Sequence, residues 1–106
     1  MGNPFTGEVT LHLDGVPHVA KLTLGALAEL EDQLGGGSLI ELIARFESHK
    51  FSTRDVLALV VAGLRGGGWQ GNAADLLKVD IGGGPLTAAK VAALLLARAF
   101  SVPGES

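Results

Sequence analysis

The stretch that decides the fold is GEVTLHLDGVPHVAKL, residues 7–22, followed directly by TLGALAELE, residues 23–31. Two runs of alternating apolar and polar residues flank Asp14-Gly15, and an Asp-Gly pair suits a two-residue turn in which both central residues have positive φ. The sequence therefore predicts a β-hairpin in which Leu13 pairs with Val16 and Leu11 pairs with His18. Because side chains alternate between the two faces of a strand, one face of this hairpin is predicted to pack on helices. That face carries Val9, Leu11, Leu13, Val16, Ala20 and Leu22.

The two outer edges of the predicted hairpin differ. Pro17 has no backbone N–H, so it blunts the edge of the second strand. The first strand has no such protection, and an isolated hairpin is only marginally stable. We therefore expect the outer edge of residues 8–13 to pair with a further strand, for which a second subunit is a candidate.

Composition limits the functions that this chain can have. Its 106 residues are 47% apolar and 5% aromatic, so one core built mainly from Leu, Val and Ala is expected. A net charge of −3 argues against nucleic acid as a partner, because nucleic acid is usually bound by a clustered basic surface. The absence of cysteine excludes disulfides and thiolate metal ligands. Residues 1–5 carry no secretory signal, so the cytoplasm is the predicted compartment.

Capping residues divide the remainder of the chain into short helices. Thr23 is placed to cap a helix that ends at Gly35. The later helix starts have either the spacing of a capping box or a proline in the first turn. They are Ser38 with Glu41, Ser52 with Asp55, Asn72 with Asp75, and Pro85.

The predicted fold class is α+β in a single domain. A hairpin occupies residues 7–22, about four to five short helices occupy residues 23–101, and residues 102–106 form a frayed tail. The last helix, residues 85–100, is rich in Ala and Leu almost all round, which indicates that it lies at the centre of the core or is buried in an oligomer. Lys90 and Arg98 leave an apolar run shorter than the roughly 20 residues of a membrane span, so no membrane insertion is expected.

Two glycine-rich loops have a phosphate-binding alternative. Gly66, Gly68 and Gly71 fit G-x-G-x-x-G, but the loop follows a predicted helix, whereas a dinucleotide site follows a strand. A helix end with a loop is therefore the favoured interpretation. Residues 82–84 could offer backbone N–H groups to an anion, but they lack the Gly-Lys-Ser/Thr of a phosphate-binding loop and are interpreted as a connection. No cofactor is predicted.

No catalytic or metal-binding constellation is predicted either. In the predicted register His12 and His18 face opposite sides of the hairpin, and His49 lies between two helices, so the three histidines do not converge. The serines at helix starts are explained as caps, and the carboxylates of residues 29–32 as a solvated helix face. We therefore expect a protein that is not an enzyme. Trp69 has the profile of a partner anchor, with a position in the core under the glycine loop as the alternative.

Several short motifs, taken in order, resemble one known family. They are Asn3-Pro4, Gly7-Glu8-Val9, Leu13-Asp14-Gly15, Leu24-Gly25-Ala26-Leu27 and Glu29-Leu30-Glu31. With them the chain resembles the small tail protein of gene transfer agents and related prophages, which is grouped with phage tail assembly chaperones. Members also carry a phenylalanine-bearing helix followed by a Ser-x-x-Asp-capped helix, a pattern that residues 44–46 and 52–64 match. The resemblance is densest before Gly35 and thins after Gly66.

The resemblance implies a non-enzymatic role in building a phage-like tail, without a small-molecule substrate. One role is a chaperone in the cytoplasm of the bacterial host that binds the apolar, helical tape measure protein before the tube closes, and that self-associates into a homo-oligomer. The other is a structural tail or tail-tube component that stays in the finished particle. The chaperone is favoured because tube walls are rings of continuous β-sheet and one hairpin supplies too few strands. A small regulatory or ligand-binding domain is a third alternative.

The family motif defines no binding residues, so contacts are expected by analogy at apolar positions of the hairpin and helices. These core or partner contacts are Leu11, Leu24, Leu27, Leu30, Trp69, Leu94 and Leu95.

Overall fold

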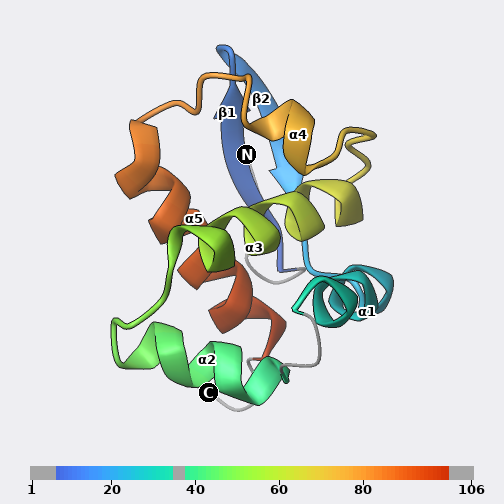
Figure 1. Cartoon of the computed structure of the whole chain (residues 1–106). Coiled ribbons are helices and arrows are strands. Elements are labelled where there is room, and N and C mark those ends of the chain that lie inside the picture. The colour runs from blue at the N-terminus through green and yellow to red at the C-terminus, as the bar shows by residue number, and fades with distance from the viewer. Residues whose placement is uncertain (1–6, 35–37, 101–106) are drawn as a thin grey trace.

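A computed structural model describes residues 7–34 and 38–100 of the chain. The elements in chain order are β1 (Val9–Leu13), β2 (Val16–Ala20), α1 (Leu24–Gln33), α2 (Leu39–Glu47), α3 (Thr53–Gly66), α4 (Ala73–Leu76) and α5 (Gly84–Ala99). This order, a hairpin followed by short helices, confirms the predicted α+β class (Figure 1). The predicted end of the first helix at Gly35 and the predicted tail of residues 102–106 lie outside the described residues.

The hairpin forms in the predicted register. Leu13 lies opposite Val16, and Leu11 lies opposite His18. Asp14 and Gly15 have φ angles of 52° and 81°, which are the positive values that a two-residue turn requires. The local signals in residues 7–22 were therefore sufficient to set the pairing of the two strands.

One face of the hairpin packs on the helices, with one exception to the prediction. Val9, Leu11 and Leu13 of β1 are buried, as is Ala20 of β2. The prediction is wrong for Val16, which is 54% exposed. Figure 1 shows the tip of the hairpin projecting beyond the helices. Next to the turn, Leu13 forms a bridge with Ile81, whereas no such bridge joins a further segment to Val16 in the described residues.

The outer edge of β1 is covered within the chain, which corrects the expectation that it is open. The backbone N–H of Asp14 donates to the carbonyl oxygen of Asp80 (2.8 Å), and the N–H of Gly82 donates to that of His12 (2.9 Å). These bonds flank an antiparallel bridge between Leu13 and Ile81. At the other end of the strand, the Arg98 guanidinium donates to the carbonyl oxygen of Glu8. The segment between α4 and α5 thus occupies much of the place that the prediction assigned to a second subunit.

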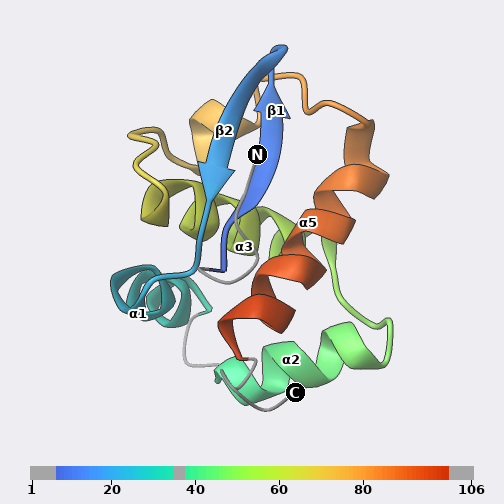
Figure 2. The same cartoon turned by 180° about the vertical axis from the view of Figure 1, so that it is seen from behind.

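The central helix is α3, which crosses the middle of the molecule. The hairpin and α5 lie on one side of it, in front of it in Figure 2, and α4 lies beside it behind the hairpin in that view. Its largest fully buried side chains are Leu59, Val60, Val61 and Leu64. The three predicted capping boxes form at the starts of α2, α3 and α4, which fixes where each of these helices begins.

The last helix, α5, is buried on one face. Ala88, Val91, Ala92, Leu95 and Leu96 lie in the interior, whereas Leu86, Leu94 and Phe100 are exposed. Its Ala/Leu composition therefore supplies both a core face and an apolar outer surface. Within the described residues, no helix has the length and apolarity that crossing a membrane requires.

Candidate functional site

The predicted separation of the histidines holds in the structure. His12 is exposed and His18 is half-buried on opposite faces of the hairpin, and His49 is exposed in the connection between α2 and α3. Among residues 7–34 and 38–100, His, Asp and Glu side chains form no group of three or more that could hold a metal ion. In the acidic stretch of α1, Glu29 pairs with Arg65 at 2.9 Å, which is a structural contact between α1 and α3.

The first glycine-rich loop has a packing role that the sequence interpretation missed. It follows α3, as predicted, and not a strand. A Cβ atom added to Gly66 would lie 2.0 Å from the carbonyl oxygen of Lys21, and one added to Gly67 would lie 1.9 Å from that of Val19. These glycines therefore allow the end of α3 to approach the backbone of β2 and the residue after it. Trp69 is partly buried and packs against the core.

The residues predicted as core or partner contacts range from fully buried to exposed. Leu11, Leu30 and Leu95 are fully buried in the core, so they are not available on the surface of the folded chain. Leu27 packs partly buried against the core. Leu24 on α1 is 85% exposed and Leu94 on α5 is 42% exposed. Because these two leucines lie on different helices, the structure does not bring them together into one predicted site.

A large hollow of the described chain lies elsewhere, between the first half of α5 and the helices α3 and α4. We call it the α3–α5 groove; its volume is about 500 Å³, in the range typical of ligand pockets. Its apolar lining is Phe51, Val56, Leu57, Val60, Leu76, Leu77, Val79, Ile81, Pro85, Ala88 and Ala89, and its other lining residues are Ser52, Thr53, Asp80 and Gly84. Nothing in a local sequence pattern shows that three separate segments, residues 51–60, 76–81 and 84–89, enclose one groove.

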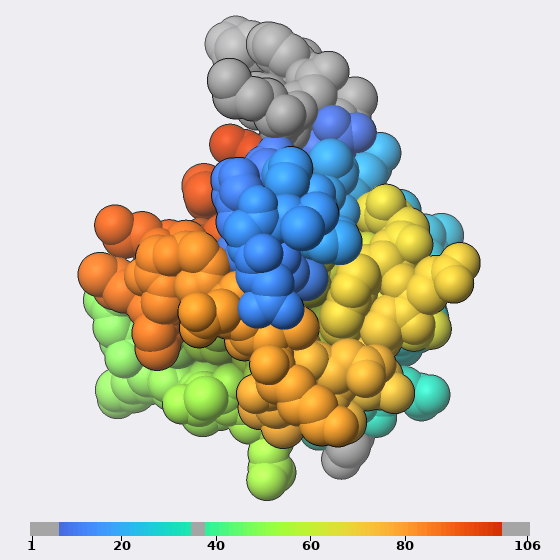
Figure 3. Space-filling view, turned by 90° about the horizontal axis from the view of Figure 1, so that it is seen from above, coloured from blue at the N-terminus to red at the C-terminus, as the bar shows by residue number. Residues whose placement is uncertain are grey.

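A second hollow adjoins the groove at the hairpin tip. It is lined by Asp14, Gly15, Asp80, Ile81, Gly82 and Gly83, so it shares Asp80 and Ile81 with the groove. Seen from above, the blue hairpin tip lies between the orange segment that leads into α5 and the yellow loop after α3 (Figure 3). Two carboxylates at this place make it a poor anion site. The phosphate-binding alternative for residues 82–84 therefore gains no support from their surroundings.

The opposite end of the groove is held by an ion pair. The Arg45 guanidinium of α2 donates two hydrogen bonds of 2.9 Å to the Asp55 carboxylate of α3. Burial raises the pKa of Asp55, but hydrogen bonds from Arg45 and from the backbone N–H of Ser52 outweigh that effect, so the pKa lies below its ordinary value. Phe46 and Phe51 stack with ring centroids 4.4 Å apart. These contacts fix the connection from α2 to α3, and with it Phe51 and Ser52 in the groove wall.

A third hollow, of about 350 Å³, lies between α2 and the second half of α5. Its lining includes Ile43, Phe46, Ala93 and Phe100, together with one acidic residue, Glu47. The surface of α5 thus borders two apolar hollows, one on each half of the helix.

A comparison with known protein families gives a match over most of the chain. The model of a family described as phage tail tube protein, GTA-gp10, matches residues 6–102. No curated protein and no solved structure matches the chain.

Proposed function

Because this chain belongs to the phage tail family described as phage tail tube protein, GTA-gp10, we propose that it is a tail assembly chaperone that binds the tape measure protein. In this role it acts without catalysis and without a cofactor. It works as a homo-oligomer in the cytoplasm of the bacterial host, before the tail tube closes.

The observation that carries this proposal is the strand content of the fold. The described residues contain two strands, and their sheet does not extend further than β1 and β2. The outer edge of β1 is bonded to residues 80–82 of the same chain. A tube wall built from continuous sheet needs free strand edges that join neighbouring subunits, and at the end of β1 next to the turn the carbonyl oxygen of His12 and the N–H of Asp14 are already bonded to residues 80–82.

The apolar surface also supports a chaperone role. Large side chains exposed to solvent occur on the hairpin and on several helices: Val16, Val19, Leu24, Ile40, Leu77, Leu86, Leu94 and Phe100. Contiguous exposed apolar surface marks a site of interaction with another protein, and here Leu77 adjoins the apolar lining of the α3–α5 groove. A long apolar helical partner needs such a surface while it waits to be enclosed.

Co-expression with the tape measure protein tests the proposal. We expect a partner that is insoluble alone to become soluble and to co-elute with this chain on size exclusion. Leu94→Glu is a suitable variant because Leu94 is exposed, so the substitution changes the surface while the fold is kept. Leu11 and Leu95 are unsuitable, since a charge at a fully buried position unfolds the chain. A tape measure protein that stays insoluble would contradict the proposal.

The alternative role is a structural component of the tail or its tube. The description of the family as a tail tube protein favours it. The two roles predict different contents of finished particles, because a chaperone leaves the tail and a component stays in it. Mass spectrometry of purified particles therefore distinguishes the two roles. Stoichiometric amounts of this chain in the particle would support the structural role and contradict the chaperone role.

A further inference from the structure

The α3–α5 groove has an apolar floor and opposite charges at its two ends. From this arrangement we propose that the groove binds a helix of a partner protein whose ends carry opposite charges. The basic end of that helix lies over Asp14 and Asp80, and its acidic end lies near Lys50, Arg54 and Lys90. The proposal deepens the proposed function and rests on it for the biological identity of the partner.

The shape and the apolar lip of the groove suit a helix. Its floor is formed by side chains of α3, such as Val56 and Leu57, and its far wall by Ala88 and Ala89 of α5. Small residues on one wall leave room for the side chains of an incoming helix. The lining residue Leu77 is 73% exposed. A helix that places an apolar stripe in such a groove covers this leucine.

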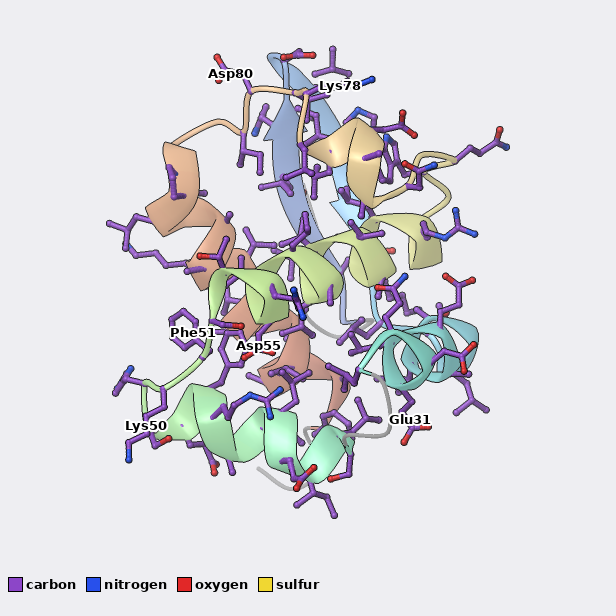
Figure 4. The ribbon with its side chains drawn as sticks, viewed as in Figure 1. Glu31, Lys50, Phe51, Asp55, Lys78 and Asp80 are labelled. Carbon is purple, nitrogen blue, oxygen red and sulfur yellow. The ribbon has the colours of Figure 1, made fainter. Side chains whose placement is uncertain are left out.

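The end of the groove at the hairpin tip is acidic. Asp80 lines the groove, and both Asp14 and Asp80 line the hollow that continues it. The two residues are held together, because a carboxylate oxygen of Asp14 accepts a hydrogen bond of 2.9 Å from the backbone N–H of Asp80. Lys78 lies close in sequence, but Figure 4 shows the side chains of Lys78 and Asp80 pointing away from each other. This end of the groove therefore carries negative charge on two exposed carboxylates.

The other end of the groove is basic. Its lining there is Phe51, Ser52 and Thr53, which Lys50 precedes and Arg54 follows directly. The lining contributed by α5 ends at Ala89, and the next residue is Lys90. Figure 4 shows Lys50 and Phe51 at the opposite end of this face from Asp80. The positive end of the α3 dipole lies here as well.

None of these charged groups belongs to an ion pair within residues 7–34 and 38–100, where the ion pairs are Arg45–Asp55 and Arg65–Glu29. The chain as a whole carries a net charge of −3, so a basic group at one end of an apolar groove stands out against an acidic surface. Complementary charges at both ends set the direction in which a helix docks, and they disfavour a helix with the same apolar stripe but no charge separation.

A pair of synthetic peptides tests the proposal. Both are about 18 residues long, enough to form helix in isolation, and both carry the same Leu/Ala stripe and the same numbers of Glu and Lys. One has Glu in its first turn and Lys in its last turn, and the other has Glu and Lys interleaved. By fluorescence anisotropy with the full chain, we expect the peptide with separated charges to bind about three- to fivefold more tightly, as expected for a few exposed charge contacts. The difference should shrink at high salt.

Two substitutions with matched controls locate the binding. Asp80→Lys should abolish the preference for separated charges, whereas Glu31→Lys, the same charge change on exposed α1, should leave it unchanged. Leu77→Asp should weaken the binding of both peptides. Leu24→Asp, at an even more exposed leucine of α1, should leave the binding of both unchanged. All four positions are exposed, so the fold is expected to survive each change.

Equal affinity for the two peptides, or a preference that Asp80→Lys leaves intact, would overturn the proposal. So would a chain that self-associates through the groove, seen as an oligomer that Leu77→Asp dissociates, because a second copy would then be the occupant. The proposed function can fail independently of the groove proposal. If the peptides bind but the tape measure protein is not made soluble, the groove is a helix-binding site and the chaperone role is wrong. If the tape measure protein is made soluble equally well by Asp80→Lys and Leu77→Asp, the chaperone role stands and the groove is not the binding site.

Discussion

The two sides of α3 are packed in opposite ways. On the side toward the hairpin, a Cβ atom added to Gly63 would lie 2.6 Å from a methyl group of Leu95, and one added to Gly66 would lie 2.0 Å from a backbone oxygen. On the other side, Val56, Leu57 and Val60 line a groove of about 500 Å³. On one side of α3 there is thus no room for an added methyl group, whereas the other side borders an open groove.

This difference separates the part of the molecule that folds the chain from the part that is free to bind. On the packed side, glycines let the helix and the strand approach closely, and the close approach adds van der Waals contacts among many buried atoms. The groove side keeps full-length Val and Leu side chains, and two of them, Val56 and Leu57, are only partly buried by the rest of the chain. If this division is correct, substitutions on the packed side cost stability, and those on the groove side cost much less.

The largest effect is expected for Leu95→Ala. Leu95 is fully buried and packs on Gly63 of α3. Truncating a buried leucine leaves a cavity, so we expect the free energy of unfolding to fall by about 4 kcal/mol. Urea unfolding followed by circular dichroism measures it. The neighbour Leu94 lies on the exposed face of α5, and Leu94→Ala should cost less than about 1 kcal/mol. Equal losses for the two variants would show that α5 is not packed as described.

Overfilling the same side should cost somewhat less. In Gly66→Ala the new methyl group meets the carbonyl oxygen of Lys21, a backbone atom that moves only if the chain after β2 moves with it. We expect a loss of about 3 kcal/mol in the free energy of unfolding. Gly25→Ala in α1 is the matched control, because the nearest atom there is 3.9 Å away, and it should stabilise the helix by about 0.5–1 kcal/mol. A neutral Gly66→Ala would mean that β2 and α3 are less closely packed.

An intermediate effect is expected at the start of α3, where Asp55 holds α2. Since the pKa of Asp55 is lowered in the folded chain, its stabilisation is present above the unfolded value of about 3.9 and is lost as pH falls through the lower folded pKa. Asp55→Asn should therefore cost about 2 kcal/mol at pH 7. It should also flatten the loss of stability below about pH 4, which thermal unfolding over a pH series measures. If the loss of stability below about pH 4 is the same in Asp55→Asn as in the unchanged chain, Asp55 is not the cause of that loss.

The parts of the fold that were predictable from the sequence are those that local chemistry specifies. The Asp14-Gly15 turn requires positive φ, and the alternation on either side of it leaves one register. Each helix start carries its own cap, so Ser38, Ser52 and Asn72 were sufficient to place three of them. These signals act between residues that lie within a few positions of each other, so both interacting residues are recognisable in the local sequence.

The parts that were not predictable depend on contacts between distant segments. Asp80 bonds to Asp14 across 66 positions, and nothing in the sequence around residue 80 indicates an extended segment beside β1. Gly66 and Gly67 resemble a helix end, although their close approach to residues 19–21 is what requires them. The groove is the most difficult feature to predict from the sequence. It is the space that remains between segments after they have packed, and composition and periodicity do not describe how segments pack.

The smallest effect is expected for Leu57→Ala, which tests the groove side directly. Leu57 is half-buried and lines a groove that is already open, so its truncation enlarges an accessible hollow and creates no closed cavity. We expect a loss of about 1 kcal/mol in the free energy of unfolding, together with weaker binding of the helical peptide with separated charges. The same urea series that measures Leu95→Ala provides the comparison. If Leu57→Ala costs as much as Leu95→Ala, both sides of α3 belong to one core, and the groove is then a packing defect that offers no site to a partner.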